Sequence, residues 1–508
     1  MHLVIIGNGI AGATTARHVR KRDPHCRITM ISAETDHFWS RTALMYIFMG
    51  HMKYAHTKPY EDWFWPKNRI ELLRKYVASV DAPQKVLHFS DGGSLSYDQL
   101  VLATGSQPNQ FGWPGQDLEG VQGMVSYQDL EKMEELAATT DQAVIVGGGL
   151  IGVEMAEMLH SRHIPVAFLV REKSFWTKAM PPEESAMLNR EIGGTEGIHL
   201  RLGEEMDRIV GDETGRVKAV ITKTGEEIPC QFVGLTAGVH PNLNLAESLG
   251  VETGRGFLVD EYLRTSVPDV YAIGDCAELR KPAPGRAGVE AIWYTGKLQG
   301  PVLAQTLTGE PTPYHQGTYF NSAKFIDIEW QTYGTVNTRP EPHEAQLYWE
   351  HPDGRKAIRL VYHRDEGHIL GFNLMGVRFR QDVCVAWLER QAPIEEVLTH
   401  LERANFDPEF FPTYEPELAN IYEQQTGQTV APAPIPVGGV AQSVLLFVGL
   451  ALALMLGAML IPGEVARGIV QGIGGFALIV ALIKLIELAQ MGFSKGFHRL
   501  QWSMNSDQ

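Results

Sequence analysis

"LVIIGNGIAGATTARHV", residues 3–19, decides the fold, because a short β-branched strand runs into a glycine turn and then into a helical pattern. "RITMIS", residues 27–32, follows as a second buried strand. Gly7, Gly9 and Gly12 have the GxGxxG spacing. In that arrangement the first glycine permits the tight turn, the second lets a pyrophosphate approach, and the third lets the helix pack on the strand. The stretch predicts a Rossmann-like dinucleotide-binding unit.

The same pattern returns in "AVIVGGGLIGVEMAEMLHSRHIPVAFLV", residues 143–170, with Gly147, Gly149 and Gly152 at the matching positions. Strand, glycine turn, helix and strand follow one another as in the first unit. Two copies in one chain predict two bound dinucleotides. A flavin (FAD) and a nicotinamide nucleotide (NAD(P)H) that exchange hydride are the natural pair.

Two further stretches extend the flavin interpretation. "LVLATGSQP", residues 100–108, is a strand that runs into a turn, and "VPDVYAIGDCAEL", residues 267–279, is a strand that ends in Gly-Asp. In this order and spacing, the four motifs resemble the FAD-dependent pyridine nucleotide-disulfide oxidoreductase superfamily. The segment "AGVHPNLNLAESLG", residues 237–250, is similar to the branch of nitrite reductase NADH subunits, oxygenase ferredoxin reductases and apoptosis-inducing factor. The resemblance covers residues 1–315 well and the following domain loosely.

The resemblance implies a set of FAD-contacting residues: Gly7, Gly9, Gly12, Glu34, Arg41, Thr104, Gly105, Gly274, Asp275, Glu290 and Ala291. The three loop glycines would hold the pyrophosphate, and Thr104 and Gly105 would line the flavin. Asp275 would bind the ribityl or phosphate region, where hydroxyl groups can satisfy its carboxylate. Glu34 would bind the adenosine ribose. Arg41 is either an FAD contact or a solvated surface arginine.

The stretch "GVEAIWYTGK", residues 288–297, contains Glu290 and Ala291 and resembles the helix whose N-terminus faces the flavin pyrimidine ring. The helix dipole at that end would stabilise negative charge on the reduced flavin.

The nicotinamide site is assigned to Gly147, Gly149, Gly152, Glu154 and Arg171. Glu154 matches a family glutamate beside the nicotinamide pocket, and the alternative is an ordinary solvated helix residue. Val170 occupies the position where an acidic residue would accept the ribose 2'-hydroxyl of NADH. Arg171 beside it would favour the 2'-phosphate of NADPH, and Glu172 would favour NADH. We expect NADH by a small margin.

Cysteine use argues against thiol chemistry. The four cysteines, Cys26, Cys230, Cys276 and Cys384, form no CxxC and no metal-ligand spacing, so we expect no disulfide framework and no metal site. Disulfide reductases of the superfamily carry a cysteine in the helix after the first βαβ unit, where this chain reads "HFWSRTALMYIFMG". We expect Cys276 to be a buried structural residue, because nothing indicates the lowered pKa that a reactive thiol needs. The net charge of -16 argues against nucleic acid as a partner.

The C-terminal part contains the uncharged run "SVLLFVGLALALMLGAMLIP", residues 443–462. The uncharged run extends over Val437–Ile461, which is long enough to cross a hydrocarbon core of about 30 Å. A second apolar stretch, "GIVQGIGGFALIVALIKLIELA", is a weaker candidate for a membrane span, because Lys484 interrupts it. With the tail residues Lys495 and Arg499 on the cytoplasmic side, the two stretches predict a membrane hairpin at the cytoplasmic membrane. The catalytic domains would lie on the cytoplasmic side.

The predicted class is α/β, with two Rossmann-like domains, an α+β third domain and a C-terminal transmembrane helical hairpin. We assign an FAD-binding domain to 1–113 and 238–313, an NAD(P)H-binding domain to 114–237, and an α+β interface or dimerisation-like domain to 314–423. A Pro-rich linker follows at 424–437, a membrane hairpin at 438–490 and a cytoplasmic tail at 491–508.

The sequence predicts an FAD-dependent NAD(P)H oxidoreductase. The favoured interpretation is a membrane-anchored enzyme that passes electrons through flavin to a membrane quinone, since an anchor brings the enzyme to a lipid-soluble acceptor. One alternative is a reductase subunit that delivers electrons to a ferredoxin-like protein or a membrane complex. Another is a non-catalytic redox sensor or scaffold. A homodimer is possible.

Overall fold

The protein is represented by a computed structural model that describes residues 1–407 and 412–430, with the isolated residues 448, 453, 463 and 480. The chain divides into two units, Met1–Gln428 and Thr429–Gln508. In the described ranges, no helix is long and apolar enough to cross a bilayer. The predicted membrane hairpin at 438–490 and the tail at 491–508 lie outside these ranges.

The first sheet is five-stranded and parallel, in the order β3-β2-β1-β7-β19, with β3 (Ile70–Arg74) and β19 (Val270–Ala272) at its edges. Its central strand β1 (His2–Ile6) pairs with β2 (Arg27–Ser32) on one side and with β7 (Gln99–Leu102) on the other. Parallel strands buried on both faces need continuous apolar runs, and β1 supplies one. Helix α1 (Ile10–Arg22) joins β1 to β2 as the crossover.

The second sheet repeats this topology in the order β12-β11-β10-β16-β9, again parallel. Strand β10 (Ala143–Val146) is completely buried, and α5 (Leu150–Ser161) connects it to β11 (Val166–Val170). The two predicted Rossmann-like units are therefore confirmed. In each, the glycine loop lies at the carboxyl end of the first strand, where such sheets bind their ligands.

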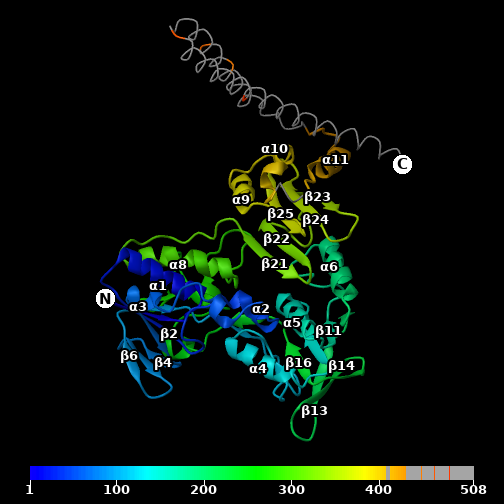
Figure 1. The fold of residues 1–508 in the computed structure, drawn as a ribbon. Helices are drawn as coiled ribbons and strands as arrows, with labels where there is room; N and C mark the ends of the chain where they lie inside the picture. The colour runs from blue at the N-terminus through cyan, green and yellow to red at the C-terminus, as the bar shows by residue number, and fades with distance from the viewer. Residues whose placement is uncertain (408–411, 431–447, 449–452, 454–462, 464–479, 481–508) are drawn as a thin grey trace. The chain divides into compact units, whose positions relative to one another are not determined.

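The core around the first sheet contains residues from two segments of the chain, one before the second domain and one after it. Leu3, Val101, Phe257 and Leu303 all belong to one buried cluster. Helix α8 (Trp293–Leu307) packs along α1, beside the first sheet (Figure 1). The chain thus leaves this domain to build the second sheet and then returns.

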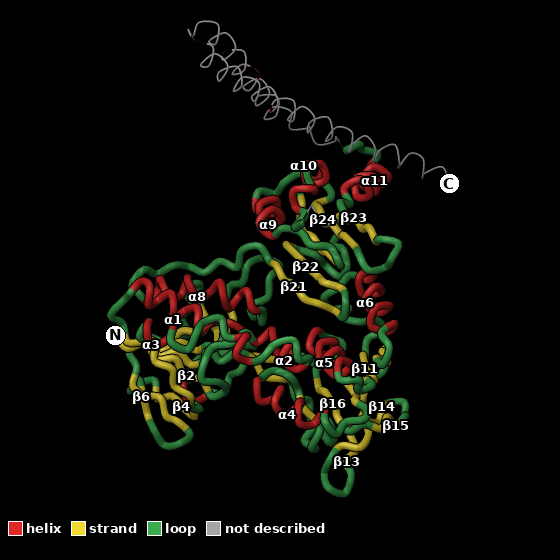
Figure 2. Tube along the Cα trace, viewed as in Figure 1, coloured by secondary structure: helices red, strands yellow, loops and turns green. Residues whose placement is uncertain are grey.

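The third domain is a five-stranded antiparallel sheet in the order β21-β22-β25-β24-β23, with helices α9 and α11 packed on it (Figure 2). Helix α11 runs from Glu415 to Thr426, so the first three residues of the linker expected at 424–437 are helical. This domain meets helix α6 (Pro182–Gly194) of the second domain through a buried ion pair, in which the Arg359 guanidinium donates to the Glu184 carboxylate at 2.8 Å. Arg359 is 3% exposed and Glu184 is completely buried.

The remaining elements of the first domain are α2 (Leu44–Phe48), α3 (Phe64–Lys67), β3 (Ile70–Arg74), β4 (Val77–Asp81), β5 (Val86–Phe89), β6 (Ser94–Ser96), β8 (Ser106–Pro108), β17 (Val239–Pro241), α7 (Ala246–Leu249), β18 (Phe257–Val259), β19 (Val270–Ala272) and β20 (Ala277–Leu279). Those of the second are β9 (Val121–Gln122), α4 (Tyr127–Ala137), α6 (Pro182–Gly194), β12 (Ile198–Leu202), β13 (Met206–Gly211), β14 (Val217–Thr222), β15 (Glu227–Pro229) and β16 (Phe232–Leu235). Those of the third are β21 (Phe320–Phe325), β22 (Ile328–Gly334), β23 (Glu344–Glu350), β24 (Ala357–His363), β25 (Ile369–Met375), α9 (Gln381–Glu389) and α10 (Ile394–Thr399). Short 3-10 turns occur at Arg41–Ala43, Tyr54–Thr57, Gly274–Cys276 and Leu401–Ala404.

Candidate functional site

In the first glycine loop, two glycines are required for packing and the third leaves space for a ligand. Gly7 has a φ of +117°, and a Cβ there would lie 2.0 Å from the carbonyl oxygen of Ala103. A Cβ on Gly12 would lie 2.1 Å from the carbonyl oxygen of Gly7, so both positions need glycine for the fold itself. A Cβ on Gly9 meets nothing within 4 Å. The open space at Gly9 fits the close approach of a pyrophosphate.

Gly9 is also the N-cap of α1, and no side chain caps this helix. The first backbone N–H groups of a helix need partners, and an anion satisfies them while it interacts favourably with the helix dipole. The loop therefore has the space and the donors that the pyrophosphate of FAD requires.

Asp275 lies in the 3-10 turn after β19 and contacts the turn after β7. The hydroxyl of Ser106 donates a hydrogen bond to the Asp275 carboxylate at 2.7 Å. Burial raises the pKa of Asp275, while this hydrogen bond and the charge of Arg41 oppose the rise. Gly274 donates its N–H to the side chain of Gln299 on α8 at 2.6 Å. The Gly274-Asp275 turn is thus fixed from two sides, and its carboxylate can accept further hydrogen bonds from ribityl hydroxyls.

Thr104 and Gly105 are joined to the chain where it returns from the second domain. The Thr104 hydroxyl donates to the carbonyl of Asn242 at 2.8 Å, and the Asn242 N–H donates to the carbonyl of Gly105 at 2.9 Å. Gly105 has a φ of +72°, and a Cβ there would meet nothing within 4 Å. Two hydrogen bonds to Asn242 therefore hold these two predicted flavin residues next to β8, and the Cβ position of Gly105 faces open space.

Glu34 and Arg41, predicted as separate FAD contacts, are paired with each other. The two Arg41 terminal nitrogens donate to the two Glu34 carboxylate oxygens, and Arg41 also donates to the carbonyl of Val125. The Tyr127 N–H donates to the same Glu34 carboxylate at 2.8 Å. Because Val125 and Tyr127 precede and begin α4 of the second domain, the pair joins the two dinucleotide-binding domains.

Glu290 precedes α8 and is engaged by its own segment. Its carboxylate accepts a hydrogen bond from Arg286 at 2.7 Å and a longer one from the Thr295 hydroxyl at 3.3 Å. Ala291 lies next to it, immediately before the α8 N-cap Ile292. Because α8 contacts the 3-10 turn that contains Asp275, its N-terminal end lies in the same domain as the first glycine loop.

The second glycine loop repeats the geometry of the first. Gly147 has a φ of +125° and lies against Thr236 of the neighbouring strand end, and a Cβ on Gly152 would lie 2.2 Å from the carbonyl oxygen of Gly147. Gly149, the uncapped N-cap of α5, has open space around its Cβ position. The loop therefore also fits a dinucleotide pyrophosphate, and the two sites belong to two different sheets.

Glu154, on the second turn of α5, has a perturbed ionisation. Burial and the negative charge of Glu157 raise the pKa of Glu154 to about 7. Glu157 is 7% exposed and forms a 3.0 Å ion pair with Lys324 of β21 in the third domain. Glu154 is therefore no ordinary solvated helix residue, because its charge changes near neutral pH. Perturbed carboxyls of this kind concentrate at functional sites.

Arg171 follows the last residue of β11 and is exposed, and its guanidinium lies 3.0 Å from the Glu172 carboxylate. This ion pair lowers the pKa of Glu172 although partial burial opposes it. Val170 is buried, and its side chain occupies the space beside Gly148. Arg171 and Glu172 lie at this strand end, and they offer opposite preferences for the 2'-substituent of a bound ribose.

All four cysteines are buried and unpaired. Cys276 contacts the carbonyls of Leu102 and Ile273, and burial raises the pKa of its thiol. A thiol in this environment stays protonated and unreactive at neutral pH.

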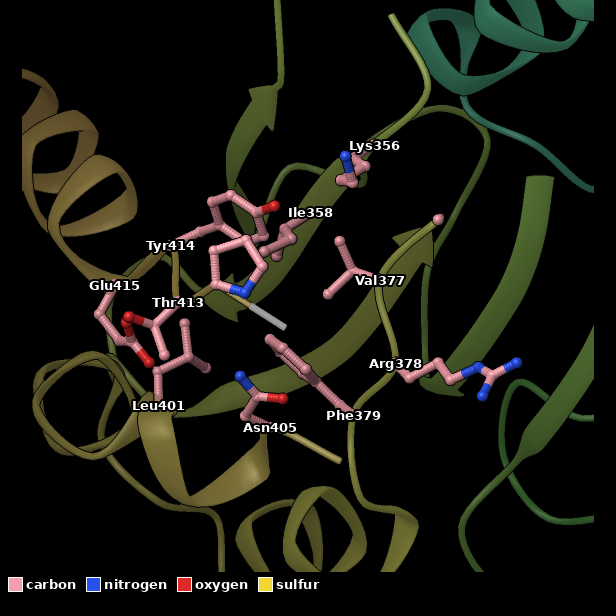
Figure 3. Close-up of a pocket in the computed structure, with 12 residues that line it drawn as sticks. Lys356, Ile358, Val377, Arg378, Phe379, Leu401, Asn405, Thr413, Tyr414 and Glu415 are labelled. Atoms are coloured by element: carbon pink, nitrogen blue, oxygen red, sulfur yellow. The ribbon is translucent and has the colours of Figure 1, made fainter. Parts of the chain in front are cut away.

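A small cavity lies within the third domain, between its sheet and the segments before α9 and α11 (Figure 3). Phe379, Asn405 and Tyr414 line it, with a volume of about 20 Å³. That volume holds one water molecule and no organic substrate. The cavity lies in the third domain, whereas the glycine loops lie in the first and second domains. We therefore expect the substrate and cofactor sites at the loops.

Several residues that shape the site carry no local signal in the sequence. Ser106 reaches Asp275 across 169 positions, and Lys324 reaches Glu157 across 167. Gly300 of α8 would place a Cβ 2.8 Å from the Thr14 side chain on α1. Only the spacing of Gly296 and Gly300, four residues apart on one helix face, could have indicated a close helix contact.

Comparisons with known proteins agree with this geometry. Residues 1–300 match the pyridine nucleotide-disulphide oxidoreductase family. The chain is 28% identical to a nitrite reductase [NAD(P)H] of Bacillus subtilis (strain 168), over 78% of this chain and 48% of that protein. It is 31% identical to a terpredoxin reductase of Pseudomonas sp, over 72% of this chain and 87% of that protein. A ferredoxin reductase structure from Rhodopseudomonas palustris has the same fold, with a TM-score of 0.70 at 23% identity, over 80% of this chain and 98% of that one. The chain spans about half the length of the nitrite reductase.

Proposed function

The chain belongs to the pyridine nucleotide-disulphide oxidoreductase family, whose typical cofactors are FAD and NAD(P)H, and from this we propose that it is an NAD(P)H-dependent flavin oxidoreductase. We further propose that it delivers electrons to a small redox protein of the ferredoxin or rubredoxin kind. FAD, when bound, accepts a hydride from the nicotinamide nucleotide and releases its electrons to the acceptor.

The observation that carries the proposal is the pair of glycine loops. Gly9 and Gly149 each leave open space at the uncapped N-terminus of a crossover helix, in two sheets of the same topology. One pyrophosphate can therefore be held by α1 and another by α5. The loop that includes Gly7 is assigned to FAD, since Asp275, Thr104 and Gly105 gather beside its sheet.

The segment after the first βαβ unit supports direct electron release rather than a thiol relay. Helix α2 contains Leu44, Met45, Tyr46, Ile47 and Phe48, with no cysteine among them. Cys276, in the 3-10 turn after β19, is buried with a raised thiol pKa. No cysteine pair in α2 would therefore relay electrons from a bound flavin.

The similarity to a terpredoxin reductase supports a protein acceptor, because this chain matches that reductase over most of both lengths. The membrane quinone predicted from the sequence is supported only by the uncharged run at 443–462. That run supports a separate proposal, that the C-terminal segment anchors the enzyme to the cytoplasmic membrane. An anchored reductase can serve a protein acceptor as well as a lipid-soluble one.

Stopped-flow spectroscopy of the full-length, detergent-solubilised protein tests the proposal. We expect NADH or NADPH to bleach the flavin absorbance within milliseconds. A ferredoxin or rubredoxin should then reoxidise the reduced protein faster than a soluble quinone analogue at the same concentration. Faster reoxidation by the quinone would move the assignment to a membrane quinone reductase. Failure of both nucleotides to bleach a bound flavin would contradict the oxidoreductase assignment.

A further inference from the structure

A lysine from the third domain reaches the nucleotide-binding helix of the second. The ammonium group of Lys324, on β21, lies 3.0 Å from one carboxylate oxygen of Glu157 on α5. The two elements lie side by side in Figure 1. Within the part of the chain that the structure describes, the other oxygen, Oε2 of Glu157, is buried without a hydrogen-bond partner. A buried carboxylate with one unsatisfied oxygen is costly, so Lys324 is the main group that compensates its charge.

The surroundings of Lys324 direct it towards Glu157. Its cross-strand neighbour Glu329 accepts hydrogen bonds from Nε and one terminal nitrogen of Arg378, so that carboxylate already has a partner. Tyr46 of α2 and Asp327 of the turn between β21 and β22 are further groups that act on its charge. Partial burial opposes ionisation of Lys324, but the ion pair with Glu157 outweighs it and raises the pKa of the ammonium group. Lys324 is therefore charged throughout the neutral range.

Glu157 in turn faces Glu154. The two residues are three positions apart on α5 and so lie on one face of the helix. After burial, the negative charge of Glu157 is the cause that raises the pKa of Glu154. With burial, that negative charge places the change in charge of Glu154 at a pH of about 7, since its pKa is about 7. A chain of three groups thus connects the third domain to the second glycine loop.

We propose that Lys324 is a positioning residue of the nucleotide site, whose ammonium group holds the Glu157 carboxylate and through it sets the charge that Glu154 presents to the nicotinamide ring. The inference rests on the proposed function, because it takes the second glycine loop as the NAD(P)H site. The oxidised nicotinamide ring carries a positive charge and the reduced ring does not. An ionised Glu154 therefore favours the oxidised nucleotide, and a neutral Glu154 lets it leave.

The test is the pH dependence of NAD⁺ binding to the FAD-loaded, full-length protein, measured by titration calorimetry between pH 5.5 and 8.5. For the wild type we expect about fivefold weaker NAD⁺ binding on the acid side of a midpoint near pH 7. ADP-ribose, which lacks the nicotinamide ring, should bind without this midpoint. The comparison of the two ligands isolates the charge next to the ring.

Two variants should move the midpoint in opposite directions. Lys324→Met leaves the Glu157 carboxylate without its cation and so strengthens the negative field on Glu154, and the midpoint should rise by about one pH unit. Glu157→Gln removes the negative charge next to Glu154, so the midpoint should fall by a similar amount. Lys324→Arg keeps the charge and should retain the wild-type midpoint. Lys218→Met, at an exposed lysine of β14, is the matched control and should also retain it.

A purely structural role for Lys324 would weaken both ligands and leave every midpoint unchanged, and that result would overturn the inference. If ADP-ribose binds but NAD⁺ shows no midpoint in any protein, the inference fails while the nucleotide site stands. If neither ligand binds the wild type at any pH, the proposed function fails and the inference fails with it.

Discussion

At the residue scale, Gly9 and Gly149 are the positions at which binding and folding can be separated. Gly9 has a φ of -70° and Gly149 a φ of -116°, which alanine adopts without strain, and neither Cβ position meets an atom within 4 Å. Gly7, Gly12, Gly147 and Gly152 are different, because a side chain there would collide with the protein itself. Each glycine motif therefore contains positions where packing requires glycine and one position where only ligand binding requires it.

Gly9→Ala should fold with a melting temperature within about 2 °C of the wild type and lose most of its FAD, because the methyl group occupies only the space of the pyrophosphate. Gly149→Ala should keep FAD and lose NAD(P)H binding. Differential scanning calorimetry of the apoproteins and the flavin content of the purified proteins measure the two effects. Gly12→Ala, the control, should destabilise the fold, and a soluble, FAD-loaded Gly9→Ala would contradict the assignment of the first loop.

At Asp275, the group that is proposed to bind the cofactor lowers the stability of the apoprotein. Since burial raises its folded pKa above the unfolded value, its contribution to stability is full below the unfolded pKa and is lost as the pH rises through the folded pKa. Ionisation of the Asp275 carboxylate therefore destabilises the apoprotein. The group persists in the site because it can accept hydrogen bonds from a ligand.

Asp275→Asn should raise the melting temperature of the apoprotein at pH 7 by about 2 °C and weaken FAD binding about tenfold. The amide oxygen still accepts the hydrogen bond from Ser106, so the turn keeps its shape. Melting curves at pH 5 and pH 7 with flavin titration provide the measurement, and the gain in stability should shrink at the lower pH. Unchanged FAD affinity would show that Asp275 does not contact the cofactor.

At the element scale, the contact between α1 and α8 positions the first glycine loop. A Cβ at Gly300 would lie 2.8 Å from the Thr14 methyl group and 3.0 Å from the Thr15 backbone nitrogen. Helices approach this closely only where a side chain is absent. The same packing holds the N-terminal segment of α8 near the turn that contains Asp275.

Gly300→Ala should destabilise the protein by about 1 kcal/mol, because overpacking costs about 1–3 kcal/mol and exceeds the gain of about 1 kcal/mol from replacing a helical glycine. Gly193→Ala, at an exposed position of α6 with open space around it, should instead stabilise the protein. Thermal unfolding of the two variants gives the comparison. If both variants shift the melting temperature upward, the close contact between α1 and α8 is not limiting.

At the scale of the whole molecule, the described domains carry all the predicted cofactor residues. The first unit, Met1–Gln428, contains both glycine loops and the third domain. The residues proposed for the chemistry all lie in this unit, and the C-terminal segment is the one that we propose as a membrane anchor. The two properties can be tested on one shortened chain.

A chain that ends at Gln428 should retain flavin and reduction by NAD(P)H at a rate within about twofold of the full-length protein, since no predicted cofactor contact is removed. Membrane fractionation should find the full-length chain in the pellet and the shortened chain in the supernatant. The point variant Gly149→Ala serves as the inactive control. A full-length chain in the supernatant would contradict the proposed anchor.

By itself the sequence determined the two Rossmann-like units, because the glycine spacing and the buried strands are local patterns within each βαβ unit. It also determined the absence of a cysteine in α2, which residue identity alone decides. The family resemblance directed attention to Glu154 and Asp275, whose pKa values are both raised in the structure. Burial causes both shifts, however, and burial is a property of the folded chain.

Only the tertiary structure decided which distant groups meet. Glu34 and Arg41, two predicted FAD contacts, pair with each other, and the Tyr127 N–H of the second domain donates to Glu34. Lys324 reaches Glu157 from a separate domain. The energy of an ion pair depends on the distance between its charges and on their burial, and neither is encoded in the spacing of residues along the chain. Local patterns thus determined the nucleotide loops, and packing between domains decided the charges around them.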